Sequence, residues 1–167
     1  AIELACSERH RDEVGGLVLF GGFASFNSTI RFAVHKRAFE DNWQLAVPHD
    51  PVNTPAVFIN LLPHLNVEGP YGRLQEAWLE MARKTWGDPA LHSVSLREPI
   101  AESIALGLAP EQRELFWVGC GLRVGGAALV EAGLANAGDF FAFTDPLPRL
   151  PLLRAPVLIT HGRDDDV

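Results

Sequence analysis

Two short apolar runs, Leu17–Phe20 and Val157–Thr160, constrain the fold of this chain more than any other sequence feature. A glycine closes each run, and Pro156 stands just before the second, where its missing N–H costs a strand little. Continuous apolar runs of this length are typical of strands that are buried on both faces of a parallel sheet. We therefore predict two parallel core strands, one near each end of the sequence.

The segment between these runs, residues 22–156, is far longer than the roughly dozen residues that a crossover between parallel strands requires. Its patterns are mainly helical, and the clearest extends from Tyr71 to Trp86. In that stretch, apolar and small side chains recur on one helical face: Leu74, Ala77, Trp78, Met81, Ala82 and Thr85. The sequence thus predicts a large helical insertion between the two strands.

Weaker signals divide the rest of the insertion. Pro110 begins a further helix, and residues 127–137 outline another that ends at Gly138. Residues 29–41 and 54–65 are less regular helical candidates. Breaks in regular structure are expected at five prolines and one glycine: Pro48, Pro51, Gly69, Pro70, Pro89 and Pro99.

The expected fold class is therefore α/β, with a partial core of two parallel strands and a large helical insertion. We divide the chain into residues 1–24, which contain the end of a helix and then a strand, the insertion at 25–150, and residues 151–167, which return to the core. The sequence starts at Ala1 within a helical pattern and stops at Val167 just after a strand. We expect both ends to be cut from a longer protein.

Charge and hydropathy exclude several kinds of partner. The chain carries 14 basic and 21 acidic residues, with a net charge of −7, and its basic residues form no stripe that could follow a phosphate backbone. No run of about 18 apolar residues is present to span a membrane, and the N-terminal segment lacks the layout of a signal peptide. We expect a soluble, cytoplasmic protein that binds neither nucleic acid nor membrane.

The two cysteines, Cys6 and Cys120, lie in mostly apolar, helix-like surroundings rather than in a spaced set such as C-x-x-C. We expect both to be reduced structural thiols, with a single disulfide as the alternative. The aromatic residues are expected mainly in the core, although Trp43 and Phe140 are candidates to line a cleft. His49 and His64 are candidates to line a pocket.

The C-terminal segment carries the clearest chemical signal, because carboxylates follow directly after a predicted strand. Catalytic groups of open parallel sheets collect outside the carboxyl ends of the strands. The pattern Pro-Val-Leu-Ile-x-His-Gly-x-x-Asp, residues 156–165, resembles the penultimate core strand of α/β-hydrolases and the loop that bears their catalytic acid. In that pattern the acid stands three residues after the glycine, which selects Asp165.

Two other segments share this resemblance. Residues 145–153 resemble the short helix that leads into the acid-bearing strand, and residues 16–22 are similar to the strand after which such enzymes often insert a cap. The resemblance implies a hydrolase that acts on an ester, lactone or related apolar acyl substrate by Ser-His-Asp chemistry, with residues 25–150 as the cap. Asp165 would orient the catalytic histidine. We expect no metal and no cofactor.

The nucleophile and the histidine of such a triad are not found in this chain. The nucleophile elbow has the pattern G-x-S-x-G, and no serine here has a glycine two residues away on either side: Ser7, Ser25, Ser28, Ser93, Ser95 and Ser103. In α/β-hydrolases the triad follows the order nucleophile, acid, histidine. We therefore expect the nucleophile before Ala1 and the histidine after Val167, and we expect this chain alone to be inactive.

Several alternatives remain open. Three consecutive aspartates, Asp164 to Asp166, also fit a solvated acidic turn, and a metal site is a third interpretation, although consecutive side chains diverge and the spaced ligands of a Ca²⁺ loop are absent. The parent protein would instead use an aspartate nucleophile if it were related to haloalkane dehalogenases or epoxide hydrolases. A non-catalytic helical module for ligand binding or interaction is the alternative outside enzymes.

Overall fold

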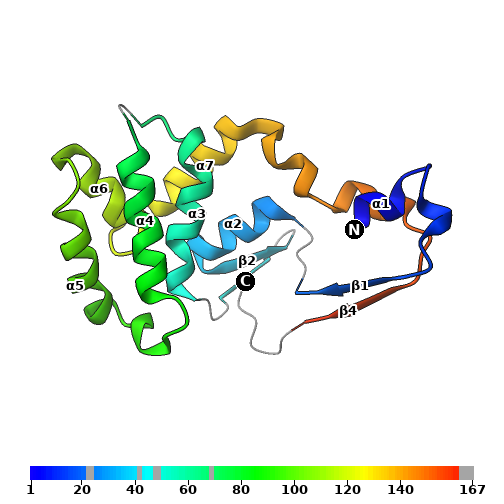
Figure 1. The fold of residues 1–167 in the computed structure, drawn as a ribbon, viewed down its shortest axis with the longest axis horizontal. Helices are drawn as coiled ribbons and strands as arrows, with labels where there is room; N and C mark the ends of the chain where they lie inside the picture. Colours follow the sequence, from blue (N-terminus) through cyan, green and yellow to red (C-terminus); the bar gives the residue numbers. More distant parts are fainter. Residues whose placement is uncertain (22–24, 41–42, 47–49, 68–69, 162–167) are drawn as a thin grey trace.

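The computed structural model describes residues 1–21, 25–40, 43–46, 50–67 and 70–161 (Figure 1). Most of these residues are helical. The α-helices are α1 (Ile2–Cys6), α2 (Phe26–His35), α3 (Thr54–Leu61), α4 (Gly72–Thr85), α5 (Val94–Ala105), α6 (Pro110–Gly119) and α7 (Gly126–Ala137). The strands are β1 (Leu17–Phe20), β2 (Arg37–Glu40), β3 (Trp43–Ala46) and β4 (Val157–Thr160). Short 3-10 helices include η2 (Pro51–Asn53), η3 (Leu62–His64), η4 (Pro89–His92), η5 (Gly138–Thr144) and η6 (Leu147–Leu152).

Both strands predicted from the apolar runs are confirmed, with the predicted bounds. β1 and β4 pair with each other in parallel, so that Leu17 lies opposite Val157 and Phe20 lies opposite Thr160. The first and last elements of the predicted α/β arrangement are therefore neighbours in space although most of the chain separates them. The structure is mixed α/β with a large, mainly helical segment between two parallel strands.

The expected burial of these strands on both faces is wrong for this chain. Val18 is 70% exposed and Phe20 is 86% exposed, and on the facing strand Ile159 is 67% exposed. The physical reason is that no other described strand pairs with β1 or β4 and no described helix covers their apolar side chains fully. β1 and β4 thus have the apolar composition of buried strands, but their side chains are largely exposed to solvent.

The helices α2 to α7 form a helical body with its own hydrophobic core, whose members lie between Ile30 and Phe141. Trp78 of α4 is 0% exposed, packs against Phe58 of α3, and donates a hydrogen bond from Nε1 to the Phe116 carbonyl at 3.1 Å. The predicted helix at 71–86 is therefore confirmed as α4. Its buried face contains five of the six residues expected there: Leu74, Ala77, Trp78, Met81 and Thr85.

The helices predicted from Pro110 and over residues 127–137 are confirmed as α6 and α7. The candidate at 54–65 is confirmed as α3, with its last turn tightened into η3. The candidate at 29–41 is only partly correct. Its helix, α2, starts earlier because the Ser25 side chain caps it, and it ends at His35, where Lys36 adopts a left-handed backbone and the chain turns into a strand.

Helix α5 and the strands β2 and β3 are not predicted by the sequence patterns. Pro99 lies inside helix α5 rather than at a break, and α5 forms because Ala101, Ile104 and Arg97 are buried beside α4 and α6. The missing N–H of Pro99 costs the helix one backbone hydrogen bond near its middle, which this packing offsets. The antiparallel pair β2–β3 is also not predicted, because β2 falls within the helical candidate at 29–41 and no element is predicted at β3.

A second region, the strand lobe, consists of α1, β1, η6 and β4 (Figure 1). Its small buried centre contains Ala5 and Cys6, and the Cys6 thiol donates to the Arg149 carbonyl at 3.2 Å. Both Cys6 and Cys120 are buried free thiols, which confirms the prediction of reduced cysteines. In Figure 1 the strand lobe lies beside the helical body, and both strands run toward that body.

Candidate functional site

The edge at which β1 and β4 end is the position that the sequence predicts for catalysis. Gly21 continues the ladder by donating its N–H to the Thr160 carbonyl at 3.0 Å, and its φ of +59° is a left-handed conformation that favours glycine. The Thr160 hydroxyl donates to the Leu19 carbonyl at 3.4 Å. Because the strands are parallel, their last residues, Phe20 and Thr160, lie side by side at this one edge, which faces the helical body in Figure 1.

Asp165, the predicted catalytic acid, lies outside the described residues, as do Asp164 and Asp166. The structure therefore describes the strand that leads to the acid but not the acid itself. His161 follows directly after β4 and is exposed at the same edge. The assignment of Asp165 stays a prediction.

A cavity of about 210 Å³ lies where the helical body joins the strand lobe. Its wall combines the start of α2 with the segment that leads from α7 to η6: Phe26, Asn27, Gly138, Asp139, Phe141, Ala142, Asp145 and Pro148. The rings of Phe26 and Phe141 lie 5.0 Å apart, and Asp145 accepts a hydrogen bond from the Leu147 N–H at 3.2 Å. The cavity thus has both apolar side chains, Phe26 and Phe141, and carboxylates, Asp139 and Asp145, in its wall.

Of the other residues singled out from the sequence, some pack against neighbouring side chains, and the side chains of the rest lie outside the described part of the structure. His64 packs against the rings of Phe140 at 4.8 Å and Phe141 at 5.5 Å. Phe140 is largely exposed. His49 lies outside the described residues, and for Trp43 the structure describes only the backbone. Among these candidates the structure therefore brings together His64 and Phe140, and it places neither of them at the ends of β1 and β4.

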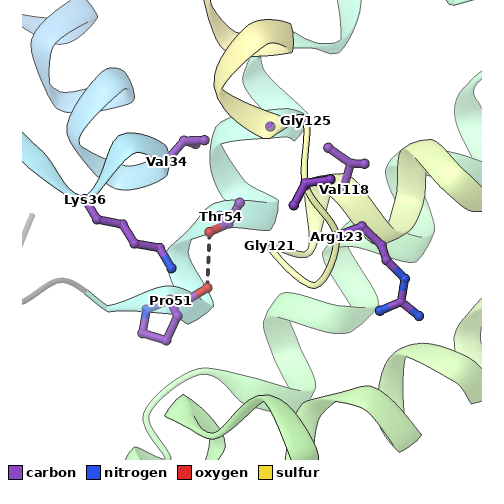
Figure 2. Close-up of a pocket in the computed structure, with 10 residues that line it drawn as sticks. Val34, Lys36, Pro51, Thr54, Val118, Gly121, Arg123 and Gly125 are labelled. Carbon is purple, nitrogen blue, oxygen red and sulfur yellow. Dashed lines mark hydrogen bonds between the residues drawn. The ribbon is translucent and has the colours of Figure 1, made fainter.

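Sequence reasoning missed a second cavity, of about 240 Å³, at the far end of α2 (Figure 2). Its walls come from the end of α2, from η2 and α3, and from the loop between α6 and α7: Val34, Lys36, Pro51, Thr54, Val118, Gly121, Arg123, Val124, Gly125 and Gly126. The only sequence signal for it is the glycine-rich stretch Gly121–Gly126. That stretch indicates a close backbone approach but not what approaches it.

The largest of these cavities, about 430 Å³, lies on the outer side of the helical body between α6, α7 and the segment after η3. Gln112 lines it and donates to the Pro70 carbonyl at 3.1 Å, while Asn136 donates to the His64 carbonyl at 2.9 Å. These amides are already used to hold backbone segments together. The cavity is therefore explained as a groove between packed elements.

Buried ionisable groups of the helical body do not form a reactive centre. Burial raises the pKa of the Cys120 thiol far above its usual range, so the thiol is protonated and a poor nucleophile. Burial lowers the pKa of Arg97, whose guanidinium donates to the carbonyls of Pro51 and Cys120. Among the described residues, no group of three or more His, Cys, Asp or Glu side chains could hold a metal ion.

Within the part of the chain that the structure describes, no helix is both long and apolar enough to cross a membrane. Comparisons with protein-family models, with curated proteins and with solved structures give no match for this chain. Its function is therefore inferred from its own residues and their arrangement.

Proposed function

We propose that this chain is the cap and acid-bearing part of an α/β-hydrolase that cleaves an ester, lactone or related apolar acyl substrate by Ser-His-Asp chemistry. Asp165 is the catalytic acid, residues 25–150 are the cap, and residues 1–24 and 151–167 belong to the hydrolase core. The nucleophile and the histidine are supplied by segments outside this sequence, since none of its serines has the glycine spacing of a nucleophile elbow.

The observation that carries this proposal is the contrast between the composition of β1 and β4 and their surroundings. Val18, Phe20 and Leu158 lie on one face of the pair, and all three are exposed. A pair of parallel strands with such side chains is stable only as part of a wider sheet with helices on its faces. The pair therefore supports a larger α/β core into which this chain fits.

The placement of the helical body supports its role as a cap. It is inserted between two adjacent parallel strands, and it lies on the side where those strands end (Figure 1). Substrates of open parallel sheets bind outside the carboxyl ends of the strands. The cavity beside Phe26 and Phe141 gives the cap an apolar wall near that edge, which suits an acyl chain.

In the proposed mechanism Asp165 accepts the Nδ1–H of the catalytic histidine and holds that ring in the tautomer that can remove a proton from the nucleophile. The carboxylate stays ionised and stabilises the imidazolium that forms during attack on the acyl carbon. An amide at this position keeps the shape but favours the wrong tautomer, so activity should fall by about 10⁴-fold.

The test uses the full-length parent protein, assayed on short p-nitrophenyl esters, with Asp165→Asn as the critical variant. Asp164→Asn and Asp166→Asn are the matched controls, because they remove the same charge from the same acidic run. We expect only Asp165→Asn to lose most of its kcat, with the fold unchanged by circular dichroism. Equal activity of all three variants and the wild type would exclude Asp165 as the acid.

A further inference from the structure

The cavity at the far end of α2 has an electrostatic character that the proposed hydrolase chemistry does not use. Two cations, Lys36 and Arg123, are among its lining residues, and no carboxylate is among the lining residues that the structure describes. Such a wall is unexpected on a chain with a net charge of −7. The local excess of positive charge favours an anionic occupant.

Of the two cations, Lys36 is the one that faces the cavity. Figure 2 shows its ammonium group directed toward Thr54 and Pro51, and no described residue forms an ion pair with it. The guanidinium of Arg123 points away, pairs with Glu98 at 3.2 Å and lies over the Trp117 ring at 4.6 Å. Glu98 therefore balances the charge of Arg123, whereas Lys36 is placed to contact a ligand.

Backbone donors lie on the opposite wall. Helix α7 starts at Gly126, and its N-cap residue, Gly125, has φ of +108° and offers no side chain to cap the first turn. The first-turn N–H groups therefore have no side-chain acceptor. A Cβ at Gly126 would lie 3.2 Å from Val34, and one at Gly121 would lie 3.1 Å from the Thr54 hydroxyl oxygen, so glycine allows these walls to approach closely.

A buried arginine, Arg97, lies next to two of the segments that line the cavity. Arg97 is only 2% exposed, and it donates Nη1 to the Pro51 carbonyl at 3.3 Å and to the Cys120 carbonyl at 3.1 Å. Its Nε has no hydrogen-bond partner within the described structure, and no described carboxylate contacts it. A buried cation paired only with carbonyl groups is costly unless negative charge lies near.

Among the described carboxylates, Asp50 acts on the charge of Arg97, and it has other partners. Asp50 accepts a hydrogen bond from the Val52 N–H at 2.9 Å and lies 3.3 Å from His92 Nε2. Its charge therefore only partly balances Arg97. Of the two residues that Arg97 holds, Pro51 lines the cavity and Cys120 directly precedes the lining residue Gly121.

From these features we infer that the cavity between the end of α2 and the start of α7 is a binding site for a small oxyanion, the phosphate group of a metabolite or free phosphate. Lys36 supplies the ionic contact, and the first-turn amides of α7 supply hydrogen bonds. Arg97 adds positive potential without touching the ligand. The site lies at the opposite end of α2 from the strand edge, so it does not depend on the proposed hydrolase function.

Lys36 allows a clean test because of its backbone. It is the only non-glycine residue of the described chain with a positive φ, +63°, a conformation that asparagine tolerates better than lysine. Lys36→Asn therefore removes the charge while suiting the turn, and Lys36→Arg keeps the charge. Lys84→Gln is the matched control, because Lys84 pairs with Glu80 at 2.8 Å on α4, away from the cavity.

The experiment titrates the chain with phosphate at constant ionic strength and follows the amide signals of Gly125 and Gly126 by NMR, with acetate and a phosphate monoester in parallel. We expect saturable phosphate binding that Lys36→Asn weakens by at least about tenfold and that Lys36→Arg and Lys84→Gln largely retain. Tighter binding of the monoester would identify a metabolite phosphate, and equal binding would identify free phosphate.

Two results would overturn the site. One is the absence of saturable shifts at Gly125 and Gly126 up to high millimolar phosphate in the wild-type chain. The other is equal weakening of binding by Lys36→Asn and Lys84→Gln, which would assign the effect to overall charge. Because Lys36→Asn is expected to unfold at the same temperature as the wild type or slightly higher, lost binding in a folded variant bears directly on the site.

Discussion

The helical body and the strand lobe differ in how far their large apolar side chains are buried. In the body, the side chains of Trp78, Phe58 and Phe116 are fully buried among the other helices. In the lobe, Phe20 and Ile159 are as apolar as those residues but lie mostly exposed. The comparison teaches that an apolar run predicts a strand or helix, whereas its burial depends on which other elements pack against it.

The largest expected contrast comes from removing one large side chain in each region. Trp78→Ala deletes a fully buried ring and its hydrogen bond to the Phe116 carbonyl, so we expect it to lower the free energy of unfolding by about 3–5 kcal/mol. Phe20→Ala removes a side chain that is 86% exposed, and the expected loss is under about 0.5 kcal/mol. Urea denaturation followed by far-ultraviolet circular dichroism measures both.

Phe20→Ala also distinguishes the isolated chain from its proposed parent. If β1 lies inside a complete sheet in the full-length protein, the same substitution there should cost as much as a core deletion. A large loss of stability from Phe20→Ala in the chain alone would mean that the chain covers its own strands, and the contrast between the two regions would then be wrong.

The next contrast concerns arginines. Arg97 is buried in the body and bridges two carbonyls, so Arg97→Ala leaves both without a partner and should cost about 2–3 kcal/mol. Arg149 of the lobe is about half exposed and pairs with Glu3 at 3.3 Å. Arg149→Ala should therefore cost under about 1 kcal/mol, and thermal unfolding of both variants at neutral pH gives the comparison.

The same two regions also separate what the sequence predicts well from what it does not. β1 and β4 were predicted with their bounds because continuous apolar residues and adjacent glycines are local signals. α4 was predicted because its apolar residues repeat with the helical period. Pro99 misled the prediction of α5, since the packing that offsets its lost hydrogen bond comes from other helices and cannot be seen locally.

The functional sites differ in the same way, since one has a local sequence signal and the other depends on tertiary contacts. Asp165 was singled out because its strand and glycine are its sequence neighbours, and its position alone gives the argument. The oxyanion cavity was not predicted, because Lys36, Thr54 and Gly126 come from segments that are distant in the sequence. The left-handed backbone of Lys36 is also contrary to what lysine favours, so no local rule could place that side chain.

The smallest contrast is electrostatic and depends on pH. In the body, Glu131 of α7 accepts three hydrogen bonds from Arg31 of α2, two from Nε at 2.9 and 3.1 Å and one from Nη2 at 2.9 Å. Glu131 also lies 3.2 Å from His35 Nε2. The hydrogen bonds from Arg31 hold the pKa of Glu131 below its ordinary value. A carboxyl whose pKa is lower in the folded chain stabilises the fold at pH values above its unfolded pKa, near 4.3, and that contribution disappears as the pH falls through its folded pKa.

Glu131→Gln should therefore lower the unfolding temperature at neutral pH by an amount worth at most about 1 kcal/mol, because the pair is partly exposed, and the difference from the wild type should shrink below about pH 4. In the lobe, Glu3 pairs with Arg149 at a longer distance and is more exposed, so Glu3→Gln should change the unfolding temperature little at any pH. Thermal melts between acid and neutral pH test both variants. A pH-independent loss in Glu131→Gln would mean that packing between α2 and α7, rather than the charge of Glu131, holds these helices together.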